Sequence, residues 1–371
     1  MKILHVADLH LDSPFSSCDV KTSTKKKRSQ ESAFNKMMEY IKEESIPLVL
    51  IAGDLFDFGF VTKKTSDMLK RAFAALPETK FVISPGNHDA MTKGSVYASE
   101  GFSDNVYIFK DSELSRFSFD ELGIDVYGYA FTEEKLETSP LASHRAEETG
   151  NIPLLCIHAD LYSPISRYAP VSREDIASFG ARYAALGHVH KGEIFERAGG
   201  CLFAYPGCLI GRSFDETGKK GALLVELDDK GEASVSHVFF SDEKYEIERI
   251  DITGAVSDAE VIEKIKEKTA EKGYGEETSL RVILVGEVSP SYIPVADAIE
   301  QSICTLASIE VKDETLPIFD AASLDSDMTL RGEVWRTLKE KLGTGTAEER
   351  EVAKKALCYA LAALDGRAIN D

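Results

Sequence analysis

Five short segments of the chain each end a predicted strand with side chains that can bind metal ions. They are Asp8-Leu9-His10, Gly53-Asp54, Gly86-Asn87-His88-Asp89, Ile157-His158 and Gly187-His188-Val189-His190. Five of the eight histidines of the protein lie in these segments. Because ligands bind at the carboxyl ends of strands in an open α/β sheet, we expect the segments to converge on one site.

The donor atoms in these segments predict which metals would bind. Seven side chains offer imidazole nitrogen or oxygen and none offers a thiolate: Asp8, His10, Asp54, Asn87, His158, His188 and His190. This set argues against structural zinc and favours two divalent ions, Mn²⁺ first, with iron or zinc as alternatives. Two ions about 3.5–4 Å apart stabilise the attacking and leaving oxygens of a displacement and lower the pKa of a bridging water. A phosphate ester is the expected substrate.

Each of these segments taken alone has an ordinary structural explanation. A single histidine at a strand end is usually a surface residue, and Gly-Asn-His-Asp can be a simple turn. The ordered set of five favours a metal site. His5, inside the first strand, is expected to be a core residue or to support a ligand. The run Lys25-Lys26-Lys27-Arg28 predicts a solvated loop or helix start, with contact to a phosphate backbone as the alternative.

The segments between the motifs predict a layered α/β fold. Short apolar strands are expected at Lys2–Ala7, Leu48–Ala52, Lys80–Ser84 and Pro153–Ile157, with helices at Ala33–Glu44 and Thr65–Leu76. Such an alternation indicates buried strands with helical crossovers. After Arg182 the strands become closely spaced and predict a second sheet: Tyr183–Leu186, Gly192–Glu196, Cys201–Ala204, Ala222–Leu227 and Ala233–Phe240.

A further change in pattern occurs near Glu246. Segments 246–252, 258–270, 279–287, 292–304 and 308–312 alternate strand and helix, which predicts a small α/β module. Beyond Asp325 two amphipathic helices are expected. The apolar face of the first would contain Leu330, Val334, Trp335 and Leu338, and that of the second Val352, Ala356, Leu357, Ala360, Leu361 and Leu364. The predicted domains are therefore 1–245, 246–322 and 323–371.

Composition and charge restrict where the protein works and what it binds. No apolar run reaches the roughly 20 residues of a membrane span, and six scattered cysteines without a CxxC pair fit a reducing compartment. We expect a cytoplasmic protein without membrane association. The net charge of −20 opposes nucleic-acid binding at long range. Residues 241–371 contain 28 acidic and 16 basic residues, a net −12, so they are the less favoured surface for nucleic acid.

The ordered motifs resemble the calcineurin-like metallophosphoesterase superfamily, whose fold is a two-sheet α/β sandwich. The resemblance covers about residues 1–245. It implies that Asp8, His10 and His190 hold one metal, that Asn87, His158 and His188 hold the other, and that Asp54 bridges the two. It also implies that His88 binds no metal and instead stabilises the developing charge or protonates the leaving oxygen.

Two further stretches are similar to the SbcD-type DNA repair exonucleases. They are Gly53-Asp54-Leu55-Phe56-Asp57, and Tyr205-Pro206-Gly207-Cys208 followed by Gly211-Arg212-Ser213-Phe214, Glu216 and Lys220-Gly221. Two positions differ from that branch, because Cys208 stands where serine is usual and Asp12 follows Leu11 where glycine is usual. The opening Ala7-Asp8-Leu9-His10-Leu11-Asp12-Ser13-Pro14-Phe15 is more similar to the YhaO-like bacterial subgroup.

The resemblance implies a DNA exonuclease or endonuclease that acts in repair with an SMC-like ATPase and forms a homodimer. A small capping domain would meet DNA, the terminal helices would dock the ATPase, and Lys25–Arg28 and Arg212 would touch phosphates. DNA binding by the chain alone is expected to be weak. A metal-dependent phosphodiesterase or phosphatase for nucleotides or other small esters is the alternative, and the net charge favours it. A non-catalytic scaffold is the third hypothesis, which the complete ligand set and His88 disfavour.

Overall fold

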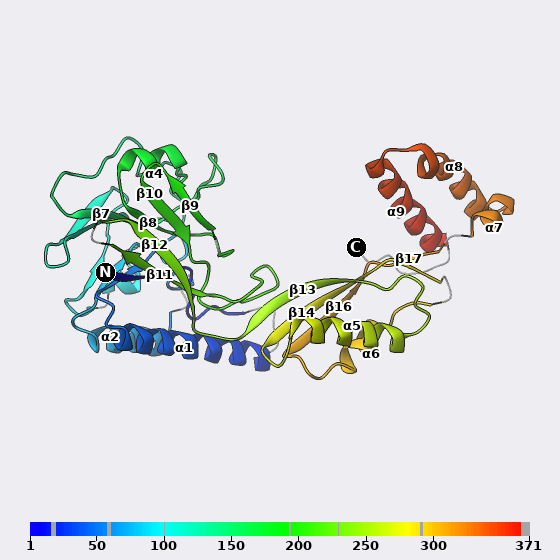
Figure 1. Cartoon of the computed structure of the whole chain (residues 1–371), viewed down its shortest axis with the longest axis horizontal. Helices are drawn as coiled ribbons and strands as arrows, with labels where there is room; N and C mark the ends of the chain where they lie inside the picture. The colour runs from blue at the N-terminus through cyan, green and yellow to red at the C-terminus, as the bar shows by residue number, and fades with distance from the viewer. Residues whose placement is uncertain are drawn as a thin grey trace. The chain divides into compact units, whose positions relative to one another are not determined.

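The computed structural model describes residues 1–15, 20–57, 61–99, 101–192, 194–228, 230–289, 292–318 and 320–364. The chain divides into two compact units, Met1–Lys244 and Tyr245–Asp371. The larger unit contains two six-stranded sheets, and the smaller unit contains a three-stranded sheet and helices (Figure 1).

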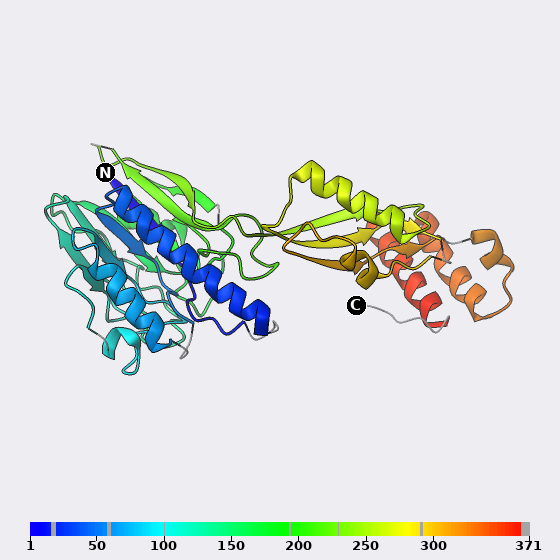
Figure 2. The same ribbon diagram turned by 90° about the horizontal axis from the view of Figure 1, so that it is seen from below.

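The first sheet of the larger unit combines parallel and antiparallel strands. Its order is β12 (Ala233–Phe239), β11 (Gly221–Leu227), β1 (Lys2–Val6), β2 (Leu48–Ile51), β3 (Lys80–Ile83) and β4 (Val106–Ile108). Strands β1 to β4 run parallel, and β11 pairs antiparallel with both β1 and β12. Helices α1 (Val20–Glu43) and α2 (Lys63–Ala74) cover its outer face (Figure 2). Phe34, Met37 and Ile41 of α1 recur at helical spacing and are buried there.

The second sheet faces the first across a buried apolar layer. Its order is β5 (Ser115–Phe119), β6 (Ile124–Gly128), β7 (Ile152–His158), β8 (Tyr183–Gly187), β10 (Cys201–Tyr205) and β9 (Ile194–Ala198). Side chains from both sheets form the core between them, including Leu50, Val82, Val126 and Leu154. The short helix α4 (Arg173–Phe179) packs on the outer face of the second sheet. The predicted two-sheet sandwich with flanking helices is confirmed.

The structure corrects the predicted membership of the sheets. Strands β8, β9 and β10 belong to the second sheet as expected, but β11 and β12 return to the first sheet beside β1. The segment Pro153–Ile157, grouped with the first strands by its pattern, lies in β7 of the second sheet. Local patterns cannot identify these pairings, because a strand that is buried on both faces has the same continuous apolar pattern in either sheet.

Helix α1 begins at Val20, well before the predicted start at Ala33. Its first turns are rich in lysine and largely exposed, so they carry no apolar periodicity that could have revealed a helix. Lys25, Lys26, Lys27 and Arg28 therefore lie on a helix. Because an α-helix has 3.6 residues per turn, these four side chains point in different directions.

The smaller unit begins with β13 (Lys244–Asp251), which lies in one sheet with β14 (Thr278–Val285) and β16 (Ser308–Asp313). Helices α5 (Asp258–Lys272) and α6 (Ala296–Gln301) bury the alternate side chains of β14 in a separate core. A second small sheet pairs β15 (Glu287–Val288) with β17 (Leu316–Pro317). No helix in the described part of the chain has the length and hydrophobicity needed to span a membrane.

Three helices follow: α7 (Ala321–Ser326), α8 (Leu330–Thr344) and α9 (Ala347–Leu364). Parts of the predicted apolar faces of α8 and α9 pack on each other, with Val334, Trp335 and Leu338 against Leu357 and Leu361. Other predicted members of these faces are exposed: Leu330, Val352, Ala356 and Leu364. Lys354 of α9 forms an ion pair with Glu287 at β15. These faces therefore contribute to the core of the unit itself, and a docking partner would have to use other residues.

Candidate metal centre

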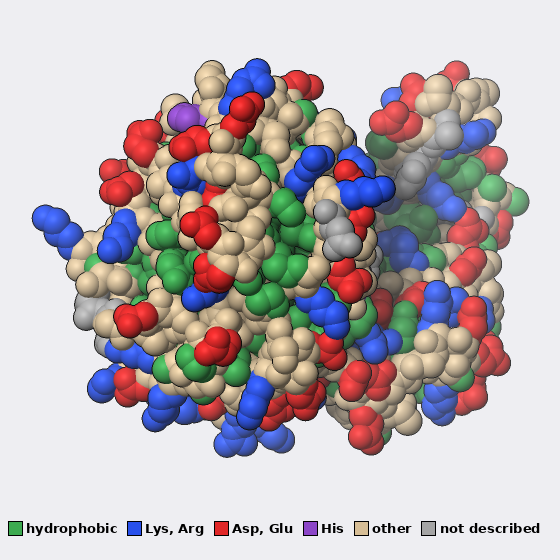
Figure 3. Space-filling model, turned by 60° about the vertical axis from the view of Figure 1, so that its left-hand side comes forward, with side chains coloured by type: hydrophobic (Ala, Val, Ile, Leu, Met, Phe, Trp, Pro, Cys, Tyr) green, Lys and Arg blue, Asp and Glu red, His purple; other side chains and the backbone are tan. Residues whose placement is uncertain are grey.

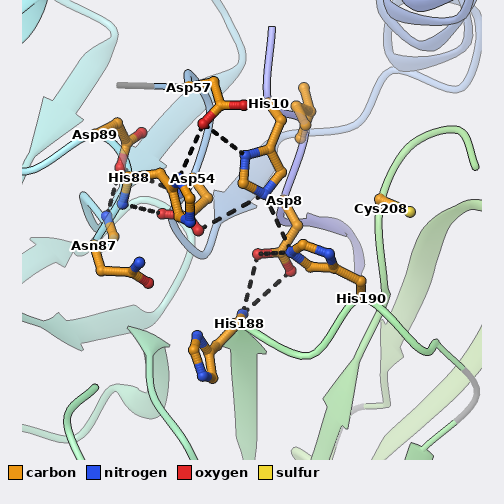
Figure 4. Close-up of polar contacts among 12 residues, drawn as sticks. Asp8, His10, Asp54, Asp57, Asn87, His88, Asp89, His188, His190 and Cys208 are labelled. Atoms are coloured by element: carbon orange, nitrogen blue, oxygen red, sulfur yellow. Dashed lines mark hydrogen bonds and ion pairs between the residues drawn. The ribbon is translucent and has the colours of Figure 1, made fainter. Parts of the chain in front are cut away.

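The five motif segments meet at one edge of the sandwich. Asp8, Asp54 and Asn87 follow β1, β2 and β3 of the first sheet, while His158 ends β7 and His188 follows β8 of the second. Figure 4 shows Asp8, Asp54, Asn87 and His188 around one centre. Asp8, Asp54 and His158 are at most 1% exposed. The expected convergence at the carboxyl ends of strands thus involves two facing sheets.

The first predicted group of ligands lies close together. One donor atom each of Asp8, His10 and His190 can be chosen so that all three lie within 4.8 Å of one another. Nε2 of His10 is 3.1 Å from Nε2 of His190, and Nε2 of His190 is 3.7 Å from Oδ1 of Asp8. Oδ2 of Asp54 lies 3.8 Å from Nε2 of His10.

The second predicted group is built around His158. Its Nδ1 lies 2.9 Å from the carbonyl oxygen of Ala52, to which it can donate a proton. Its Nε2 then has only a lone pair, yet it faces Oδ1 of Asn87 at 2.9 Å and Oδ2 of Asp54 at 3.4 Å. Three electron-pair donors that converge in a buried place without a proton between them are what a bound cation requires. The residues therefore fit a metal ion.

His188 is placed somewhat apart from the other ring nitrogens. Its ring centroid lies 5.3 Å from that of His158, and its Nε2 is 3.9 Å from Oδ2 of Asp160. Its backbone N–H lies 3.2 Å from both carboxylate oxygens of Asp8, to which it can donate. His188 thus orients one candidate ligand through its backbone while its side chain lies beside another.

The electrostatics of the centre also fit bound cations. Burial raises the pKa of Asp8 to about 7, so this carboxylate is unstable as a buried anion without a positive neighbour. Burial lowers the pKa of His10 to about 4, of His158 to about 3 and of His188 to about 4. These rings are neutral near pH 7, which is the form in which imidazole binds a metal. Oxygen and imidazole donors suit a hard or borderline divalent ion.

Several candidate ligands have unusual backbone conformations. The φ angles of Asp8, His10, Asp54 and His188 are 51°, 44°, 52° and 110°, a region that residues other than glycine rarely occupy. Such conformations cost free energy and concentrate at functional sites. The surrounding strands and hydrogen bonds hold these four side chains in place.

The glycines of the motifs are required by close packing. A Cβ atom at Gly53 would overlap the ring of His158, and one at Gly86 would overlap the carboxylate of Asp54. At Gly187 it would overlap the carbonyl oxygen of Ala52. The glycine that precedes a ligand in each of these motifs therefore lets the backbones approach each other closely enough to assemble the centre.

His88 lies beside the ligand groups and is paired with a residue that the sequence analysis assigned no role. Its Nδ1 is 2.9 Å from Oδ1 of Asp57, and its side chain is 38% exposed on the open side of the centre. The hydrogen bond to Asp57 raises the pKa of His88. The neighbouring His10 and the hydrogen bond from His88 hold the pKa of Asp57 well below its usual range. Asp57 is the second acidic residue of the Gly-Asp-Leu-Phe-Asp motif, and its place in that motif was the sequence feature that could have indicated a role.

Asp89 is a second residue whose role the sequence did not reveal. Its carboxylate accepts hydrogen bonds from the backbone N–H groups of Asp54, Leu55 and Gly86 at 3.2, 2.8 and 2.6 Å. The hydroxyl of Tyr97 donates to it at 2.6 Å. Asp89 thereby joins the loops after β2 and β3, which carry Asp54 and Asn87.

Glu216 supports the other side of the centre. Its Oε1 lies 2.8 Å from Nδ1 of His190, its Oε2 accepts from Sγ of Cys208 at 3.4 Å, and the guanidinium of Arg212 contacts both carboxylate oxygens. Although burial opposes it, the hydrogen bonds from His190 and Arg212 hold the pKa of Glu216 well below its ordinary value. When Nδ1 of His190 donates to Glu216, its Nε2 keeps a lone pair for a metal.

The predicted phosphate-binding residues are separated by the structure. Nζ of Lys26 donates to the carbonyl oxygen of Arg212 at 2.7 Å and lies 5.4 Å from the ring centroid of Phe15. Lys25, Lys27 and Arg28 are exposed on the surface of α1. Of the run, Lys26 is therefore the residue held against the loop that carries Arg212, and Arg212 itself is held by Glu216.

Comparisons with known proteins agree with the geometry. The family model for calcineurin-like phosphoesterases matches residues 1–192. The chain is 28% identical over 298 residues to the uncharacterized metallophosphoesterase YhaO of Bacillus subtilis, covering 77% of this chain and 72% of that protein. It is 26% identical over 260 residues to the DNA double-strand break repair protein Mre11 of Methanopyrus kandleri, covering 62% of this chain but only 55% of that protein.

Two solved structures share general features with the chain at low identity. One is a protein of Thermus thermophilus, with a TM-score of 0.39, 11% identity, and coverage of 64% of this chain and 98% of that one. The other is a dimetal phosphatase from Danio rerio, with a TM-score of 0.39, 13% identity, and coverage of 63% and 98%.

Proposed function

The chain belongs to the calcineurin-like phosphoesterase family and is a metal-dependent phosphoesterase, and from this premise we propose that it hydrolyses phosphodiester bonds of DNA. The observation that carries the hydrolytic chemistry is the position of Asp54, whose Oδ2 lies 3.8 Å from Nε2 of His10 and 3.4 Å from Nε2 of His158, with the His88–Asp57 pair beside them. The choice of DNA is supported by the relative named as a DNA double-strand break repair protein.

We propose the following ligands for two divalent ions, Mn²⁺ before iron or zinc. Asp8, His10 and His190 would hold one ion, Asn87, His158 and His188 the other, and Asp54 both. Two ions bound there would polarise a phosphoryl oxygen and lower the pKa of a water molecule between them.

His88 supplies the proton chemistry in this proposal. Its Nδ1 donates to Asp57, so its second nitrogen can present a proton on the open side of the centre. Because Asp57 raises the pKa of His88, the protonated form is available near neutral pH. That form can stabilise negative charge on the phosphate or protonate the leaving oxygen. Asp57 acts through His88 and is a positioning residue.

Small phosphate esters remain the second candidate, and the charge of the chain favours them. The net charge is −20. Figure 3 shows one face of the larger unit, where basic and acidic side chains alternate around hydrophobic ones and no continuous basic surface is present on that face. A small diester needs no extended basic surface, whereas a long polyanion gains most of its affinity from one.

The test compares two substrates on Mn²⁺-loaded protein. Release of nucleotides from duplex DNA is measured beside hydrolysis of bis(p-nitrophenyl) phosphate. We expect turnover of both, with DNA preferred in kcat/KM. Asp54→Ala should abolish both reactions, and His144→Ala, a change at an exposed histidine of the same unit, should affect neither. Hydrolysis of the small diester without any cleavage of DNA would reject the nuclease proposal and favour the alternative.

We also propose an SMC-like ATPase as the partner that supplies most of the DNA affinity. The inward faces of α8 and α9 are buried against each other, but α9 keeps a second stripe exposed: Val352, Ala356 and Tyr359, at spacings of four and three residues. This spacing is typical of a helix that packs along another helix. The stripe is the surface that we assign to the partner.

Two measurements test the partner proposal. The isolated chain should bind DNA weakly, and the slope of log K against log salt, about 0.9 for each phosphate neutralised, should become steeper when the partner is present. The double variant Val352→Asp/Tyr359→Asp should lose the partner, whereas Val256→Asp, at another exposed valine of the same unit, should not. Tight, strongly salt-dependent binding by the chain alone would refute the idea.

The remaining assignments stay proposals. We propose residues 1–245 as the catalytic domain, 246–322 as a capping domain and 323–371 as the docking segment. A cytoplasmic location is supported by the free thiols of the cysteines in the described part of the chain. Cys18 lies outside the described residues. Homodimer formation is a prediction from the family resemblance, and sedimentation measurements on the purified chain test it.

A further inference from the structure

Three aromatic side chains form an exposed cluster on the side of the sandwich where β9 and β12 approach each other. The ring of Phe195 lies 5.0 Å from that of His237, which in turn stacks on Phe239 at 5.6 Å with an interplanar angle of 5°. Phe195 and Phe239 are 40% and 43% exposed. Nζ of Lys219 lies 5.9 Å from the ring centroid of Phe239. We call these four residues the aromatic cluster.

Strand register places the aromatic cluster at the same edge as the candidate metal centre. Phe239 pairs with Gly221, the first residue of β11, and the start of β11 lies beside the end of β1, where Asp8 follows. On the other sheet, β9 begins beside Tyr205, the last residue of β10, a few residues after His190. Strand β12 is two strands from β1, a separation of about 10 Å at the usual strand spacing.

The contacts that join the edges of the two sheets do not explain why these rings are exposed. At the opposite end of β12, Ala233 is buried in the core between the sheets, and Arg197 of β9 donates to its carbonyl oxygen at 3.1 Å. The two edge strands are thus joined by ordinary packing and a hydrogen bond far from the centre. Near the centre, two phenylalanine rings instead keep about two fifths of their surface in water, which is costly for an apolar side chain.

We propose that the aromatic cluster is a stacking subsite for an unpaired nucleobase of the substrate strand, close to the phosphate that is hydrolysed. Every base has a flat π face, so aromatic side chains hold single-stranded nucleic acid without regard to sequence. Nζ of Lys219 lies beside the rings and pairs with Oδ1 of Asp242 at 3.5 Å, so a phosphate of the strand would replace Asp242 as its partner. The inference rests on the proposed action on DNA and narrows it to strands with unpaired bases.

The subsite also explains how an acidic chain can select a nucleic-acid substrate. Stacking depends little on net charge, whereas phosphate contacts depend strongly on it. A base inside a duplex has both faces covered by its neighbours, so it cannot use the cluster. Frayed ends and single strands should therefore be preferred over the interior of a duplex.

A fluorescent base provides the test. Wild type and Phe195→Leu/Phe239→Leu are mixed with a single-stranded oligonucleotide that carries 2-aminopurine and phosphorothioate linkages to slow hydrolysis. We expect stacking to quench the fluorescence in the wild type, and the variant to lose the quench and at least about 5-fold in affinity. Leucine keeps the packing apolar, and thermal unfolding checks that the variant folds. The control is Val256→Ala, a change at an exposed apolar residue of the smaller unit that should have no effect.

A second oligonucleotide, with an abasic residue at the quenched position, completes the design. The wild type should bind this abasic strand as weakly as the variant binds the normal strand. The affinity of the variant should be the same for both strands. Equal affinity and quench in wild type and variant would overturn the subsite, even if DNA is cleaved. A change of oligomeric state without a change in affinity would also overturn it, because the rings would then serve a protein contact. Quenching without any cleavage of DNA would reject the nuclease proposal and leave the subsite standing.

Discussion

The His88–Asp57 pair gives the sharpest prediction. We consider Asp57→Asn, which keeps the size of the side chain but removes its charge. In the wild type, Nδ1 of His88 donates to Oδ1 of Asp57 at 2.9 Å, and the hydroxyl of Ser13 donates to Oδ2 at 3.0 Å. Asparagine can still accept one of these hydrogen bonds, so the loop should keep its conformation while the charged interaction with His88 is lost.

The size of the effect follows from the interaction that is removed. A hydrogen bond between charged groups contributes about 1.5–3 kcal/mol, which corresponds to roughly a 10- to 150-fold decrease in kcat when the bond acts in the transition state. His88→Ala removes the proton donor itself and should cost about 10²–10⁴-fold. Because Asp57 acts through His88, the double variant should be no slower than His88→Ala alone.

The assay is steady-state hydrolysis of bis(p-nitrophenyl) phosphate by all four proteins, with the metal content of each measured in parallel. Metal content is essential because Oδ1 of Asp57 also lies 3.8 Å from Nδ1 of His10, a candidate ligand. All four proteins should hold the same amount of metal. If the double variant loses the product of the two single effects, Asp57 acts independently of His88. If His88→Ala empties a metal site, its assignment as a non-ligand is wrong.

Three further predictions concern the metal ligands and the residues that support them. Elemental analysis and Mn²⁺ titration should give close to two equivalents of metal per chain, and hydrolysis should be fastest with Mn²⁺. Asp54→Ala or His158→Ala should lose metal. Full activity at one equivalent would reject the two-ion centre. Glu216→Gln should weaken metal binding about 10- to 100-fold because His190 loses its charged acceptor, and a titration that matches the wild type would contradict this. Gly187→Ala should destabilise the fold by about 1–3 kcal/mol in urea unfolding, since its Cβ would overlap the carbonyl oxygen of Ala52. Gly94→Ala is the control, because a Cβ there meets no neighbour within 4 Å, and an equal loss of stability would contradict the reasoning.

The sequence predicted the parts of the fold that depend on local pattern. Strands β1, β2 and β3 and helix α2 lie within a few residues of their predicted positions, because each is a short run with a clear apolar period between turn residues. The α/β module that begins near Glu246 appears in the same order of strands and helices. What local pattern could not supply was the pairing of β11 with β1, which joins residues more than 200 positions apart.

In the candidate site, too, residues in local motifs could be predicted, whereas residues that act through contacts between loops could not. The metal-type side chains stand in recognisable motifs, so the sequence could name them. Asp57, Asp89 and Glu216 could not be assigned because their roles depend on hydrogen bonds to other loops. Asp89, for example, looks like one more ligand of the Gly-Asn-His-Asp stretch, yet its oxygens accept three backbone N–H groups. The run Lys25–Arg28 lies on the exposed first turns of α1, which agrees with the predicted solvated helix start, and consecutive residues on a helix cannot all face one site.

The acidity of the centre and its chemistry are connected. Asp8, Asp54 and Asp89 are buried within one small region, and burial raises the pKa of Asp8 to about 7 and that of Asp89 to about 6. His10 and His158 have lowered pKa values and so cannot supply compensating charge near pH 7. Asp89 accepts three backbone N–H groups, whereas Asp8 and Asp54 each accept one and otherwise lie beside imidazole nitrogens. The fold therefore concentrates negative charge and lone pairs at a place where bound cations would relieve the repulsion. The same cations would offset part of the charge of −20 where an anionic phosphate must approach.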